Sequence, residues 1–71
     1  MIAVTVEEVI RALPGGGVEY VPVGTTTVFP EAEEPSEMPA LWQTCLNAAY
    51  AAVGVERPVN VGGSGQVIYK A

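Results

Sequence analysis

Residues 38–53 read MPALWQTCLNAAYAAV, and this stretch decides the fold predicted from the sequence. Its apolar residues recur every three to four positions, which is the period of a helix. Pro39 is tolerated in a first helical turn, and Gly54 suits the position just after a last turn. We therefore expect a helix that begins at Ser36 or Met38 and ends near Val53. Two adjacent rows are expected to form its buried face, with three polar or aromatic residues opposite: Leu41, Cys45, Ala48 and Ala52, beside Trp42, Leu46, Ala49 and Val53, with Gln43, Asn47 and Tyr50 on the other side.

A shorter helix is expected near the beginning of the chain, over about residues 5–13. Thr5 and Glu8 have the spacing of a capping box, in which each side chain satisfies a free amide of the first turn. Pro14 and the three glycines after it end the element. Its apolar stripe has the helical spacing i, i+3, i+4 and i+7: Val6, Val9, Ile10 and Leu13.

Two β-hairpins are expected, one after each helix. Residues 18–23 and 26–29 are rich in β-branched and aromatic residues, with Gly24-Thr25 between them as a tight turn. Pro22 cannot donate a ladder hydrogen bond, which makes the first strand an edge strand or a bulged one. The second hairpin pairs residues 59–61 with 66–69 around the glycine-rich segment 62–65, and a faint echo between the two halves leaves an internal duplication open.

The predicted fold is therefore a single small α+β domain over residues 1–71. It has two layers and the order α-β-β-α-β-β, with an antiparallel sheet of two hairpins packed by two helices. A domain of this size has a thin stability margin. It has one cysteine and no histidine, so neither an internal disulfide nor a zinc site of the usual ligand type can support it.

An acidic loop is expected over residues 30–39, which read PEAEEPSEMP. Like charges repel and prolines stiffen a chain, so we expect this segment to be extended and solvated. Such a segment could dock into a basic groove of a partner, or occupy a nucleic-acid-binding surface in place of nucleic acid. The loop could instead serve only to keep the protein soluble and to act as a linker of fixed length. The candidate partner-binding residues are the four glutamates of the loop and the lone tryptophan, which is either a core residue or an interface residue: Glu31, Glu33, Glu34, Glu37 and Trp42.

Charge excludes some classes of partner. The formal net charge is −5, and charged residues make up 15% of the chain, against about 25% in a typical domain. The three bases, Arg11, Arg57 and Lys70, form no patch, so direct binding to nucleic acid or to an anionic membrane is disfavoured. No apolar run is long enough for a membrane helix, and no basic stretch precedes the first apolar residues as in a secretory signal. The low charge predicts a partly neutral or apolar surface, which is typical of a contact surface.

Residues that usually carry catalysis are scarce. The chain has no histidine and no aspartate, and Cys45 lies on the apolar face of the expected helix, where a buried core role is expected. The loop glutamates are too solvated for acid–base catalysis and lack the pattern of a calcium site. The glycines at 62–65 precede a strand, which favours a hairpin turn over a phosphate-binding loop. We therefore expect no catalytic residue, no cofactor and no metal, and we expect that the chain is not an enzyme.

Two functions follow from these expectations. The first is a non-enzymatic protein-interaction or structural subunit of a larger assembly, such as a small protein of a virus particle, with another protein or a second copy as its partner. The second is a small acidic inhibitor or adaptor that binds a basic site on a target protein. An enzyme subunit that completes an active site at an interface stays open as a third. A lone cysteine fits a reducing compartment, the cytoplasm or a virion.

Overall fold

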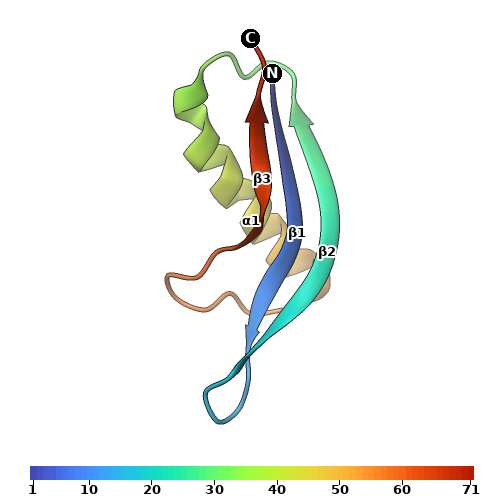
Figure 1. Ribbon diagram of the computed structural model, residues 1–71, viewed down its shortest axis with the longest axis vertical. Coiled ribbons are helices and arrows are strands. Elements are labelled where there is room, and N and C mark those ends of the chain that lie inside the picture. Colours follow the sequence, from blue (N-terminus) through green and yellow to red (C-terminus); the bar gives the residue numbers. More distant parts are fainter.

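The computed structural model covers residues 1–71 and contains one sheet and one α-helix. The elements follow in the order β1 (Ile2–Ala12), β2 (Val18–Phe29), a 3-10 turn η1 (Pro35–Glu37), α1 (Met38–Val53) and β3 (Gly63–Tyr69). The strands form an antiparallel sheet in the order β2-β1-β3, and α1 crosses one face of it (Figure 1). The expected order of two helices and two hairpins is therefore wrong.

The segment expected as the first helix is the central strand β1. Its first half alternates, with Ile2, Val4 and Val6 fully buried toward α1. A bulge between Val6 and Glu8 then adds one residue to β1 relative to β3, and Val9 returns to the buried face. This extra residue puts Val6 and Val9 three positions apart on one face of a strand. The spacing imitates a helical stripe, which explains the wrong prediction.

The strand β2 is continuous where the sequence predicted a hairpin. Gly24 has a φ of 67° but marks the register shift within β2, opposite the bulge of β1, and not a reversal of the chain. The reversal lies earlier, where Gly15 and Gly16 have φ values of 91° and 101° between β1 and β2. Positive φ strongly favours glycine, so this run suits the turn. Pro22 lies in β2, which is an edge strand and irregular there, as predicted.

The second predicted hairpin is also wrong, because residues 54–62 form a loop and only β3 follows it. Gly63 and Gly65 belong to β3 and do not form a turn. A Cβ atom on Gly65 would lie 3.1 Å from the Trp42 ring, and one on Gly63 would lie 3.0 Å from Leu46, besides meeting the backbone of β1. These glycines let α1 and β1 approach β3 closely. The halves of the chain do not share the repeated order that a duplication requires.

The helix α1 confirms the main prediction, because it runs from Met38 to Val53 and ends at Gly54 in the left-handed conformation. The buried face of α1 differs from the expected one by a rotation about the helix axis. Ala48 and Ala52 are exposed, whereas Tyr50 is only 3% exposed. Tyr50 can be buried because its hydroxyl finds two backbone partners. The single α-helix lacks the length and the apolar composition of a membrane-spanning helix.

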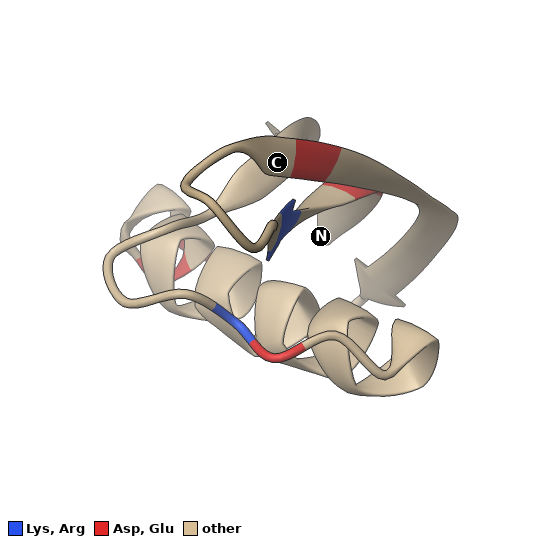
Figure 2. Ribbon diagram, turned by 90° about the horizontal axis from the view of Figure 1, so that it is seen from below, with Lys and Arg blue, Asp and Glu red and all other residues tan.

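The core lies between α1 and one face of the sheet. Cys45 and Leu46 belong to it, as the sequence predicted. On the other side of the sheet no element covers the strands, as the view along them shows (Figure 2). The ten buried residues are Ile2, Val4, Val6, Val9, Ala32, Cys45, Leu46, Ala49, Tyr50 and Val55.

Candidate functional site

The uncovered side of the sheet, here called the open face, carries large apolar side chains. Residues paired directly across an antiparallel ladder share a face. Ala3 pairs with both Val28 and Ile68, and Ile10 pairs with Tyr20, all opposite to the buried side chains of β1. Val28, Tyr20 and Ile68 are 54%, 59% and 45% exposed. Between these two apolar ends the open face is polar, with a hydrogen bond of 2.9 Å between the hydroxyls of Thr5 and Thr26.

The hairpin formed by residues 11–20 extends beyond the rest of the molecule (Figure 1). Every one of its residues is exposed, because β3 pairs with β1 only as far as Val9. Val18, 56% exposed, pairs with Ala12 and continues the apolar side of Tyr20 along the hairpin. An exposed ion pair of 3.3 Å joins Arg11 to Glu19. The open face and this hairpin together therefore carry two apolar areas separated by polar residues: one at Val28 and Ile68, the other at Tyr20 and Val18.

A groove of about 320 Å³ lies between the first half of α1 and β3, and is called the α1/β3 groove here. Its wall on the helix includes Trp42, which packs on the core and is half-buried. One part of the Trp42 ring is therefore core and another part lines the groove, where an interface role stays a prediction. The strand on the other side, β3, pairs only with β1, so its outer edge is free. The lining residues are Met38, Pro39, Trp42, Gly65, Gln66 and Val67.

The acidic loop is folded, so the expectation of an extended segment is wrong, although its four glutamates are all exposed. A carboxylate oxygen of Glu37 accepts hydrogen bonds of 3.1 Å from the backbone amides of both Glu33 and Glu34. The hydroxyl of Tyr69 donates to the carbonyl of Glu33 at 2.8 Å. The backbone nitrogen of Met1 donates to the carbonyl of Ala32 at 2.7 Å. These contacts hold the loop against the ends of β1 and β3.

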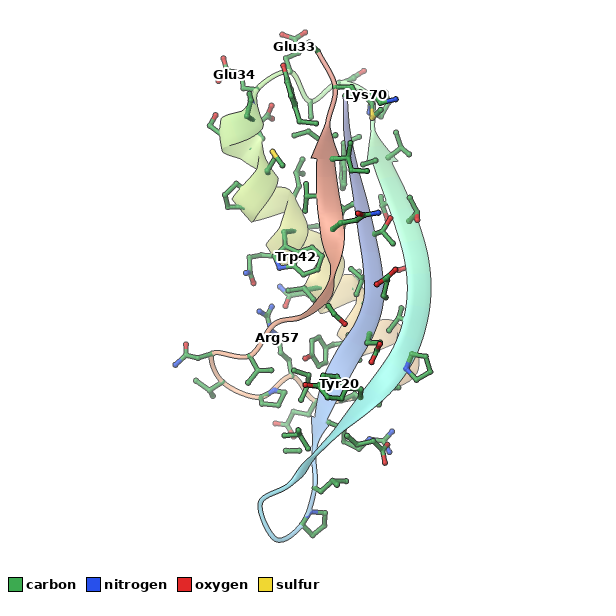
Figure 3. All side chains as sticks on the ribbon, viewed as in Figure 1. Tyr20, Glu33, Glu34, Trp42, Arg57 and Lys70 are labelled. Carbon is green, nitrogen blue, oxygen red and sulfur yellow. The ribbon has the colours of Figure 1, made fainter.

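The structure divides the predicted partner-binding residues into two groups. Glu33 and Glu34 lie at the end of α1 where the α1/β3 groove begins, and Trp42 lies further along it (Figure 3). Glu37 is engaged in capping, and Glu31 lines a separate hollow beside Phe29. Two of the loop glutamates and Trp42 therefore lie along the same side of α1.

Arg57 marks the opposite end of this side of α1 (Figure 3). Its Nε donates to the carbonyl of Val61 at 2.7 Å, and its Nη1 donates to the side chain of Asn47 at 2.8 Å. The guanidinium lies 5.8 Å from the ring centre of Tyr50. Arg57 thus ties the loop after α1 to the helix, and it has no carboxylate partner.

These surfaces present exposed apolar side chains, carboxylates and a free strand edge. The thiol of Cys45 is buried in the core, and no three side chains of the metal-binding types come together. No protein-family model, curated protein or solved structure matches the chain. Sequence reasoning named the glutamates and Trp42 as candidate partner-binding residues. It missed the open face and the groove, because their strands were assigned to a helix and to a hairpin turn. The available signal was the alternation of Ile2, Val4 and Val6.

Proposed function

We propose that this chain is a non-enzymatic binding subunit of a larger protein assembly, in which a partner covers the open face. The observation that carries the proposal is the pair of exposed apolar areas on that face, Val18 with Tyr20 and Val28 with Ile68. Exposed apolar areas bordered by polar residues commonly mark protein contacts. A sheet covered on one face only leaves a thin core of ten buried residues, which a partner would extend.

The partner that fits is a different protein with basic groups around an apolar patch. The chain has eight acidic residues against three basic ones, and Arg11 is already paired with Glu19. Two copies would therefore repel each other, whereas a basic partner would be attracted and oriented. The same charge supports the related role of an acidic adaptor on a basic target. Cys45 as a free, buried thiol fits a reducing compartment for this subunit.

Native mass spectrometry of the chain isolated from its own cells tests the proposal. We expect a complex of fixed stoichiometry with a second protein. Replacing Tyr20 and Val28 by lysine places two charges on the open face and should abolish that complex, because a buried unpaired charge is strongly unfavourable.

The matched control uses the same strand. Thr27 is exposed, but it pairs with the buried Val4 and so points away from the open face. Thr27→Lys should leave the complex intact. A monomeric wild type, or a complex that survives the double replacement at Tyr20 and Val28, would refute the proposal.

A further inference from the structure

The α1/β3 groove has the geometry of a site for an extended peptide. One wall is the helix surface at Met38 and Trp42, and the other is the backbone of β3 at Gly65. Gly65 has no side chain, which lets the Trp42 ring lie close to the backbone of β3 at this point. Aromatic side chains in such half-buried positions are common binding hot spots.

The free edge of β3 supplies the hydrogen bonds for such a ligand. The strand uses one side for β1 and leaves the other unpaired from Gly63 to Tyr69. An extended segment can add to an unpaired edge through main-chain hydrogen bonds, while its alternate side chains enter neighbouring pockets. The groove lies directly along this edge, so both kinds of contact are available to one ligand.

The charged residues at the two ends of the groove indicate which charges a ligand should carry. The carboxylates of Glu33 and Glu34 lie exposed where the groove begins, and neither forms an ion pair. Arg57 lies toward the other end, near the start of β3. A ligand with a lysine or arginine beside the two glutamates matches this arrangement.

The net charge of the chain disfavours a second copy at this site. Closed dimers have twofold symmetry, so two β3 edges would pair antiparallel. Because β3 runs from the Arg57 end toward the end with Glu33 and Glu34, this pairing brings the glutamates of each copy, together with its Lys70, toward Arg57 of the other. The local charges would then be compatible, but each copy carries a net charge of −5, so two copies repel each other overall.

We propose that the β3 edge binds an extended segment of a partner protein as a fourth strand, with an apolar side chain against Trp42 and a basic side chain beside Glu33 and Glu34. This site is distinct from the open face. It gives the binding subunit a second contact, through which it could hold a linear segment of the same partner or of another one.

The test selects ligands from a random-sequence library of short linear peptides displayed on phage, with the full chain as bait. We expect the selected peptides to alternate apolar residues and to carry lysine or arginine at one end. Hydrogen exchange of the chain with a selected peptide should show protection at Gly63–Tyr69 and not at β2. Peptides without this pattern, or protection of β2 or the open face, would overturn the inference.

Variants test the two contacts separately, with affinity measured by fluorescence anisotropy. Trp42→Ala should weaken binding about tenfold or more. Glu33→Gln with Glu34→Gln should weaken it about fivefold at low salt. Raising NaCl from about 50 mM to about 500 mM should weaken the wild type but have little further effect on that double variant. If Trp42→Ala does not fold, Pro39→Arg places a cation at the exposed rim of the groove and should weaken binding in its place.

Controls separate this site from the open face. Thr44→Ala lies on an exposed part of α1 outside the groove, and Glu7→Gln with Glu19→Gln removes two charges elsewhere, so both should bind as the wild type does. The double lysine variant at Tyr20 and Val28 should also bind the peptide normally. If this variant loses the cellular complex but still binds the peptide, the result bears on the open face and not on the α1/β3 groove. Equal loss in the control variants, or dimerisation of the chain through β3, would overturn the peptide site alone.

Discussion

The hydroxyl of Tyr50 lies 2.6 Å from the carbonyl oxygen of Gly62 and donates a hydrogen bond to it. The same hydroxyl accepts a bond of 3.1 Å from the backbone amide of Ile10. One side chain on α1 therefore joins the central strand to the loop that leads into β3. This junction sets the position of β3, and with it the α1/β3 groove.

Tyr50→Phe should lower the free energy of unfolding by about 1–3 kcal/mol, because it leaves a partly buried amide and carbonyl without their partner. Chemical denaturation measures the change. Tyr20→Phe removes a hydroxyl from a side chain that is 59% exposed, and should change stability by less than about 0.5 kcal/mol. Equal effects at the two tyrosines would contradict this account of the junction.

Leu46→Ala should destabilise the chain by about 2–5 kcal/mol, because Leu46 is fully buried and its removal leaves a cavity in the core. In a domain this small the loss can exhaust the stability. Gln43→Ala, an exposed change on the same helix, should have little effect. The midpoints of urea unfolding compare the two variants. A small effect at Leu46 would mean that another face of α1 is buried.

Gly65→Ala should destabilise the fold by about 1–3 kcal/mol, because the added methyl group meets the carbonyl of Thr5 and the ring of Trp42. Differential scanning calorimetry should show a lower Tm. Gly17→Ala is the control, because its added Cβ makes only an ordinary contact of 3.7 Å with Leu13. A Gly65→Ala variant as stable as the wild type would show that α1 and β3 are further apart than described.

Arg57→Lys should loosen the loop of residues 54–62 with little change in the rest of the fold. An ammonium group cannot reproduce the planar arrangement that reaches the carbonyl of Val61 and the side chain of Asn47 together. Hydrogen exchange should be faster in this loop and unchanged in β1. Arg11→Lys affects only an exposed ion pair and should leave both segments as they are. If hydrogen exchange in the loop of the Arg57→Lys variant is unchanged, then contacts other than those of Arg57 order the loop.

Much of the candidate site depends on parts of the chain that the sequence predicted correctly. The exposed glutamates, the position of Trp42 on a helix and the burial of Cys45 follow from local composition and from the helical period. The open face and the groove could not be predicted in the same way. Both depend on β1 and β3 being strands, and the apolar spacing of β1 is ambiguous between strand and helix at the bulge.

By itself, the sequence determined α1, the edge position of Pro22, and a surface that is acidic and poor in bases. These features are local: a helical period with a glycine after its end, a missing amide hydrogen, and a count of charges. Tertiary contact decided the rest. The alternation of buried and exposed residues in β1 shifts between Val6 and Glu8, because β1 has one residue more there than the paired strand β3. Gly63 and Gly65 became strand residues because α1 and β1 lie against them, and the acidic loop folded because Met1 and Tyr69 supply hydrogen-bond donors from distant positions. Such pairings join residues far apart in the chain, and no local pattern encodes them.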